Sequence, residues 1–253
     1  MSAYLTEIWR HPIKSCGRET LTRVLLTENR TLPWDRRWAI AHEASAYDPE
    51  NPAWVACANF ARAAKAPMMQ AITARCHMAY GTVTLSHPKL QDLTIDPDKP
   101  EDGADLIQWI MPISPGNRAL PATVVRNGLR GMTDTDFPSI SIINLGSHRA
   151  VETKLGRLIS PGRWRPNLIV DGLEPWTERD WIGKRIRVGL AELEVRENIV
   201  RCLATSTSVS TGQRDTDTLG ALESGWGHRE FGVYAVVTKT GDINQADQVE
   251  VIG

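Results

Sequence analysis

Cysteine is scarce in this sequence. The four cysteines among 253 residues (Cys16, Cys57, Cys76 and Cys202) lie far apart, and no two of them form a C-x-x-C pair. Such spacing argues against a disulfide scaffold, and structural zinc sites usually take their ligands in closely spaced pairs. We therefore expect reduced thiols, of which one or two at most have a function.

Long apolar runs and an excess of either charge are also missing. No run approaches the roughly 20 apolar residues of a membrane helix, and residues 1–10 alternate like a strand instead of forming a signal peptide. The formal net charge is −1, which gives no electrostatic basis for binding nucleic acid or an anionic membrane. We expect a soluble, cytoplasmic protein with no nucleic-acid partner and no membrane insertion.

Short apolar segments separated by Pro, Gly and Asn dominate the chain, and this pattern predicts a β-barrel or sandwich. We expect strands within residues 4–9, 21–27, 34–41, 54–58, 71–75, 82–85, 93–95, 122–127, 139–143, 166–170, 184–197, 231–238 and 247–252. Helices are expected at 104–111, at 145–158 with Asn144 as cap, and as a turn at 218–224, whereas the acidic segment 92–105 is predicted to be a solvated loop. The fold class is mainly β (α+β) and not doubly wound α/β. No G-x-G-x-x-G or Walker sequence accompanies it.

Cys202 lies where a predicted strand ends and a polar loop begins. Arg201 precedes it and Thr205-Ser206-Thr207 follow, and neighbouring cations and donors favour the thiolate. The thiol could bind a metal, attack a substrate or merely fill space, since a lone cysteine is more often a buried small apolar residue. We assign Cys57 and Cys76 to the core and leave Cys16 ambiguous.

A cysteine nucleophile also needs a histidine base. His11, His148 and His228 are candidates, although no local sequence ties one of them to Cys202.

Basic residues stand at three predicted strand ends. Lys14-Ser15, Arg36-Arg37 and the Arg163–Asn167 segment each combine cations with small donors. The arginine fork suits phosphate or carboxylate, and lysine adds a point charge. If these loops converge they form an anion cradle; the alternative is a set of scattered surface arginines.

Six motifs occur in the order typical of one known family. They are His11-Pro12-Ile13-Lys14-Ser15-Cys16, Asp35-Arg36-Arg37-Trp38, Asp136-Phe137-Pro138, Arg165-Pro166-Asn167-Leu168-Ile169-Val170, Arg201-Cys202 with its Thr/Ser run, and Phe231-Gly232-Val233-Tyr234. With them the chain resembles the MOSC family (molybdenum cofactor sulfurase C-terminal domain) preceded by its N-terminal β-barrel partner. It is similar to the mitochondrial amidoxime-reducing component and its bacterial counterparts. The resemblance implies an N-terminal β-barrel-like domain at 1–125 and a C-terminal MOSC β-barrel with a few helices at 126–253.

The resemblance also implies a molybdenum cofactor, in which a pyranopterin dithiolene holds the metal and Cys202 completes the ligand set. It assigns the phosphate of the pterin to Lys14, Ser15, Arg36, Arg165 and Asn167, and it places Asp136, Ser139 and Thr205 in the same site. A deprotonated sulfur is the ligand that such a metal favours.

From this resemblance we expect a molybdenum-dependent oxidoreductase that reduces N-hydroxylated or related N–O or S–O small molecules. The chain ends without a four-cysteine run, so electrons are expected from a separate flavin, haem or iron–sulfur protein. The alternatives are a non-redox module that carries the cofactor or sulfur through Cys202, and a cysteine–histidine hydrolase.

Overall fold

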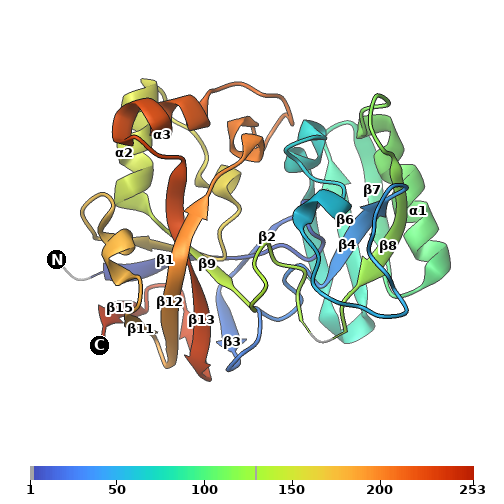
Figure 1. Cartoon of the computed structure of the whole chain (residues 1–253). Coiled ribbons are helices and arrows are strands. Elements are labelled where there is room, and N and C mark those ends of the chain that lie inside the picture. Colours follow the sequence, from blue (N-terminus) through green and yellow to red (C-terminus); the bar gives the residue numbers. More distant parts are fainter. Residues whose placement is uncertain (1–2, 129) are drawn as a thin grey trace.

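A closed barrel of β-strands forms one half of the molecule in the computed structural model, which describes residues 3–128 and 130–253 (Figure 1). Around the barrel, neighbouring strands follow in the order β1 (Ala3–Arg10), β10 (Leu168–Asp171), β9 (Ile140–Asn144), β13 (Glu230–Lys239), β12 (Ala191–Val200), β11 (Arg185–Val188) and β15 (Gln248–Val251). β15 pairs again with β1 and closes the barrel. β2 (Glu19–Leu21) extends β1 outward, and β3 (Arg23–Leu26) pairs with β14 (Gly241–Asn244).

Alternation along the strands explains the core of this barrel. In β11, Ile186 and Val188 are buried while Arg185 and Arg187 are exposed, because successive side chains of a strand point to opposite faces. β9 is buried on both faces because helices cover the barrel end where it finishes. Barrel closure leaves these strands without a free edge.

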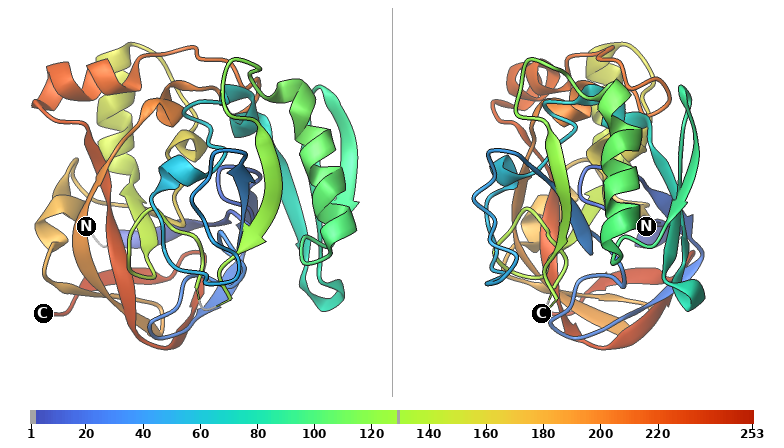
Figure 2. Two further views of the ribbon diagram at one scale, coloured as in Figure 1. Left: turned by 45° about the vertical axis from the view of Figure 1, so that its right-hand side comes forward. Right: turned by 90° about the vertical axis from the view of Figure 1, so that its right-hand side faces the viewer.

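Two smaller sheets form the other half. β4 (Trp38–His42) pairs with β8 (Pro121–Arg126), and β6 (Thr82–His87) lies between β5 (Thr73–His77) and β7 (Leu90–Ile95). Helix α1 (Pro100–Ile110) packs on β7 and β8, at the outer side of this half (Figure 2). It buries Gly103, Leu106 and Ile110, three positions on one face of a helix.

Two further α-helices lie side by side at one end of the barrel (Figure 1). α2 (Leu145–Leu155) starts where the Asn144 side chain accepts a 2.8 Å hydrogen bond from the Gly146 amide, and α3 (Thr218–Trp226) is capped by Asp217. Short 3₁₀ helices complete the described secondary structure at Cys57–Asn59, Pro67–Ala71, Met78–Tyr80, Met111–Ile113, Pro161–Trp164, Thr177–Trp181 and Leu203–Ser206.

The predicted mainly β fold with a C-terminal barrel and few helices is confirmed. The division at residues 125 and 126 stays a prediction; strand β1, from the first segment, completes the barrel of the second. Among residues 3–128 and 130–253, no helix is both long enough and apolar enough to cross a membrane.

Three local predictions were wrong. Residues 54–58 form no strand, since Pro52 and the small residues around Cys57 lead into a 3₁₀ turn instead. The segment 92–105 is not a loop: it completes β7 and then begins α1 at Pro100, a residue that suits the first helical turn. Cys57 and Cys76 are only half-buried, because their segments lie near the surface.

Candidate functional site

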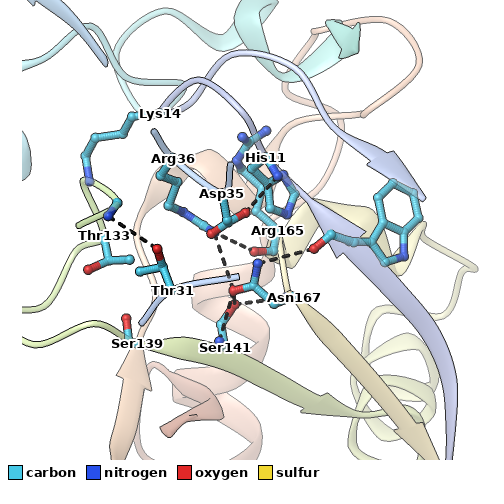
Figure 3. A network of polar contacts seen from close by, with 12 residues as sticks. His11, Lys14, Thr31, Asp35, Arg36, Thr133, Ser139, Ser141, Arg165 and Asn167 are labelled. Atoms are coloured by element: carbon cyan, nitrogen blue, oxygen red, sulfur yellow. Dashed lines mark hydrogen bonds and ion pairs between the residues drawn. The ribbon is translucent and has the colours of Figure 1, made fainter. Parts of the chain in front are cut away.

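Loops from both halves of the molecule meet beside the barrel (Figure 3). The Lys14 ammonium, which is 4% exposed, donates to the Met132 carbonyl oxygen at 2.8 Å and to Asp134 Oδ1 at 2.5 Å. The Arg36 backbone amide donates to the His11 carbonyl oxygen at 2.6 Å, and Nη2 of the Arg36 side chain donates to the Arg165 carbonyl oxygen at 3.1 Å. The three predicted basic loops are therefore brought together.

Ser15, Arg36 and Arg165 share an uncommon backbone conformation. Their φ angles are +60°, +49° and +49°, in the left-handed region that costs a non-glycine residue roughly 1–2 kcal/mol. Strain of this kind persists where surrounding contacts over-determine the backbone, and it gathers at ligand sites. All three residues were predicted to bind the cofactor; Asn29, Trp34, Trp176 and Ala246, which were not, also have positive φ angles.

The Arg165 side chain is incompletely paired. Its Nη2 donates to the Gly17 carbonyl oxygen at 3.1 Å, whereas Nη1 is buried without a hydrogen-bond partner among the described residues. Burial, together with repulsion from Arg36 and Arg18, lowers the pKa of Arg165 to about 9. A guanidinium in this position is short of counter-charge, which an anion would supply.

Arg201 is a second incompletely paired cation, and it directly precedes Cys202. Its Nε donates to the Phe231 carbonyl oxygen at 2.8 Å and its Nη1 to the Trp164 carbonyl oxygen at 2.7 Å. Its Nη2 is buried without a partner in residues 3–128 and 130–253. Burial lowers the pKa of Arg201 to about 10.

Aromatic rings and a glycine hold the Arg201 guanidinium in place. It lies 5.6 Å from the centre of the Trp164 ring and 5.7 Å from that of Phe231, within cation–π range. Gly232 has φ +73°, and a Cβ there would lie 2.5 Å from the Ile142 carbonyl oxygen and 3.3 Å from Arg201 Nη2. The Phe231-Gly232 motif thus makes room for Arg201. Arg201 is not among the predicted site residues, although this motif carries the signal for it.

The Cys202 thiol is exposed at the end of β12. Its backbone oxygen accepts hydrogen bonds from the Thr205 amide at 3.2 Å and the Thr205 hydroxyl at 3.0 Å. Thr205 also hydrogen-bonds with the Thr218 hydroxyl at 2.7 Å and is buried. Thr205 therefore stabilises the turn that follows Cys202.

Each of the three candidate histidines is hydrogen-bonded to groups other than Cys202, although His11 Nδ1 is buried without a partner among the described residues. His11 Nε2 bonds to the Pro166 carbonyl oxygen at 2.9 Å, and His148 bonds to the Ile159 carbonyl oxygen and to the Trp164 indole at 3.0 Å each. His228 contacts Arg179 and accepts from the Glu230 amide. No histidine of the described residues is hydrogen-bonded to Cys202, so the hydrolase hypothesis lacks the base that it requires.

Asn167 connects three strands of the barrel. Its Oδ1 accepts from the Ser141 amide at 3.0 Å and the Ser141 hydroxyl at 2.9 Å, while its Nδ2 donates to the Trp9 carbonyl oxygen at 3.2 Å. The side chain is 1% exposed. These contacts give Asn167 a structural role beneath Arg36, whose Nη1 lies 3.4 Å from Oδ1.

In the loop before β9, the acid that lies in the site is not the one predicted from the sequence. Asp136 is exposed, and its backbone oxygen accepts from Arg130, while Ser139 is buried and accepts from the Thr135 hydroxyl at 2.8 Å. The acid of this loop that joins the basic cluster is Asp134, which pairs with Lys14, while the buried Asp35 pairs with Arg36. Attraction to Lys14 and to the two nearby arginines outweighs the partial loss of water around Asp134 and holds the pKa of this carboxyl below its ordinary value.

The residues present fit a metal whose other ligands come from an organic cofactor. Within residues 3–128 and 130–253, no group of three or more His, Cys, Asp or Glu side chains is placed to hold a metal ion. Cys202 is accessible and directly follows Arg201, and Arg201 and Arg165 each have a buried N–H donor without a partner among the described residues. These groups suit one metal–sulfur bond and one anionic group.

Known families and structures agree with this fold. Residues 2–111 match the model of the MOSC N-terminal beta barrel domain, and residues 133–250 match that of the MOSC domain. A crystal structure of the YUAD protein from Bacillus subtilis is similar, with 14% identity, 99% of this chain and 96% of that chain covered, and a TM-score of 0.50.

Two YiiM structures are similar over less than half of this chain. For the protein from Geobacillus stearothermophilus the identity is 20%, with 45% of this chain and 54% of that chain covered and a TM-score of 0.36. For the Escherichia coli protein the identity is 16%, with the same coverage and a TM-score of 0.35. No curated protein matches the chain. MOSC domains are associated with molybdenum cofactor binding, and the chain belongs to the family of MOSC-domain proteins that carry a MOSC N-terminal beta barrel domain.

Proposed function

We propose that this protein binds the molybdenum cofactor and uses it to reduce small N-hydroxylated or related N–O or S–O compounds. The observation that carries the proposal is the pair of unpartnered guanidinium nitrogens, Arg165 Nη1 and Arg201 Nη2, in the cationic cluster that ends at the exposed Cys202 thiol. Buried donors without partners are rare in folded proteins, and a phosphate would satisfy both kinds of need, charge and hydrogen bonding.

Each residue of the cluster has a proposed role. Cys202 provides the sulfur ligand to the metal. Lys14, Arg36 and Arg165 surround the phosphate of the pterin, and Ser15 presents its hydroxyl from the strained loop between them. Arg201 directly precedes the metal ligand in the chain and adds a further cation near Arg36.

The remaining predicted residues act from the walls of the site. Ser139 and Asp136 belong to the loop that would border the cofactor, with Asp136 at its exposed end. Asn167 holds the strand that follows Arg165, and Thr205 holds the turn that follows Cys202. Both orient cofactor contacts chiefly through the backbone.

When bound, the molybdenum centre would supply the two-electron, oxygen-accepting chemistry of the reduction. The chain's own residues bind, orient and tune it. The exposure of Cys202 leaves the metal position open to small molecules and to a separate electron-donor protein.

A carrier that delivers the cofactor or a Cys202 persulfide is the second candidate. It is favoured by the exposed apolar side chains beside the thiol, Val200 at 72% and Leu203 at 43%, since exposed apolar groups around a functional residue suit protein docking.

A turnover assay separates the two candidates. Protein made in a host that produces the cofactor is supplied with a chemical reductant and with an amidoxime or a hydroxylamine. The reductase predicts substrate loss that disappears in Cys202→Ala. Bound cofactor without turnover on any N–O or S–O substrate would instead identify the carrier.

A further inference from the structure

A second cavity lies in the half formed by the small sheets. It occupies about 160 Å³ between the end of β4, residues 58–66 and the loop 114–121. The Ala61 amide donates to the Ile40 carbonyl oxygen at 2.8 Å, and the Glu43 amide donates to that of Leu120 at 3.0 Å. Main-chain hydrogen bonds therefore hold two of its walls to β4 and the strand's continuation.

The charged side chains that line this cavity are all basic, while the Glu43 carboxylate lies outside the lining, 3.4 Å from the Leu120 amide. Arg62, Lys65 and Arg118 line it, and no Asp or Glu does. In the described part of the chain none of these three forms an ion pair, and the contact of Arg62 is from Nη1 to the Cys57 sulfur at 3.3 Å. Three cations that face one hollow without a carboxylate create a positive potential inside it.

His42 provides an unfilled polar position in the same wall. Its Nε2 bonds to the Ala58 carbonyl oxygen at 2.7 Å, while Nδ1 is buried and has no partner among residues 3–128 and 130–253. A carbonyl oxygen can only accept, so Nε2 carries the proton and Nδ1 is an acceptor, which a water or a ligand hydroxyl can satisfy but a carboxylate cannot.

Apart from Ser114, the rest of the lining is apolar. The Phe60 ring, Pro115 and Pro121 contribute to it together with alanine side chains. A cavity of about 150 Å³ is enough to hold benzene, and an arginine fork binds a carboxylate through two hydrogen bonds. The cavity therefore matches a ring-sized apolar body that ends in a carboxylate.

We propose that this pocket binds a small aromatic or similarly apolar carboxylate, at a site distinct from the one around Cys202. None of its lining residues belongs to the cationic cluster described above. The two sites are neighbours through Phe60, because the Lys14 ammonium lies 5.9 Å from the centre of the Phe60 ring. The proposal does not depend on the bound metal or on any reductase activity.

Benzoate is the probe, and benzamidine is its cationic counterpart of the same shape. In an NMR titration of the full chain we expect benzoate to move the amide signals of Phe60, Ala61 and Arg62, and benzamidine to bind at least about tenfold more weakly, the effect of losing one charge-assisted contact. Equal binding of the two probes would overturn the proposal, as would benzoate shifts that appear only around Cys202.

The double variant Lys65→Gln/Arg118→Gln removes two exposed charges without opening the core. We expect it to weaken benzoate at least about tenfold, while Arg23→Gln, which changes an exposed arginine of the barrel half, leaves the affinity unchanged. Unaltered affinity in the double variant, or an absence of benzoate binding to wild type at millimolar concentration, would contradict the proposed site.

Discussion

Lys14 and Asp134 form an ion pair between the loop after β1 and the loop before β9, with 2.5 Å between Nζ and Oδ1. Lys14 follows β1 and is 4% exposed, whereas Asp134 precedes β9 and exposes 54% of its side chain. The pair fixes the loop before β9 against the cationic cluster. It also balances one of the positive charges near the proposed phosphate position.

Replacing Asp134 should make the free energy of unfolding less dependent on pH in the acidic range. The pKa of Asp134 is lowered in the folded protein, so its contribution is complete above the unfolded value of about 3.9 and is lost as the pH falls through the folded value. Because the carboxylate is half-exposed, we expect Asp134→Asn to lower the free energy of unfolding by about 1 kcal/mol at pH 7. Urea denaturation between pH 7 and pH 2 measures this.

The wild type and Asp134→Asn should converge at the acid end of that series. Asp136→Asn is the matched control, since Asp136 lies two residues away, is exposed and forms no ion pair among the described residues. A constant difference between wild type and Asp134→Asn at every pH would show that the charge of Asp134 is not involved.

Asn167→Ala tests whether this asparagine is a structural residue. The substitution leaves the Ser141 amide and the Trp9 carbonyl oxygen without their partners in a buried position. Each unpaired buried group costs about 1–3 kcal/mol, so the free energy of unfolding should fall by at least about 2 kcal/mol. Denaturation of the cofactor-free protein checks this, and a fall below about 0.5 kcal/mol would return Asn167 to a role in ligand binding alone.

The left-handed backbone at Arg165 predicts an unusual order of two variants. Both Arg165→Gly and Arg165→Ala lose the same hydrogen bond to Gly17, but glycine avoids the penalty at φ +49°. We expect the glycine variant to be more stable than the alanine variant by about 1 kcal/mol. At Thr20, an exposed position in strand β2, the order should reverse, because glycine normally costs about 0.5–1 kcal/mol relative to alanine. The same order at both positions would rule out strain at Arg165.

Inorganic phosphate should stabilise the cofactor-free protein through Arg165 and Arg201. At tenfold excess over its dissociation constant it contributes about 1.4 kcal/mol, which raises the melting temperature by about 3 °C in a chain of this size. Chloride at matched ionic strength should do much less. The shift should persist in Lys65→Gln/Arg118→Gln and disappear in Arg165→Gln and Arg201→Gln; a shift that survives all of these variants would mean non-specific binding.

The barrel strands and their ends could be predicted from the sequence. The segments of β11, β12 and β13 alternate or are continuously apolar, and each stops at glycine or polar residues. The role of Asn144 as the N-cap of α2 was equally predictable, since a cap depends on neighbouring residues alone. The segment 92–105 misled because its acidic residues suggested a solvated loop, although Glu101 and Asp102 favour a helix start.

Within the candidate site, the types of residue could be predicted from the sequence, whereas their hydrogen-bond and ion-pair partners could not. The convergence of Lys14, Arg36 and Arg165 depends on loops far apart in the chain, and so does the choice of Asp134 over Asp136 as the acid of the cluster. Asn167 was expected to contact the phosphate, but its hydrogen bonds across three strands appear only once those strands are paired.

The most direct test of the account is the molybdenum content of the purified protein with and without Cys202. Cys202 is exposed and no hydrogen bond to its thiol occurs in the described residues, so Cys202→Ala should melt within about 2 °C of the wild type. From a host that makes the cofactor, we predict one molybdenum and one pterin for each wild-type chain, and a severe loss of metal in the variant. Wild-type protein without molybdenum, or a Cys202→Ala variant that retains it fully, would contradict the central claim.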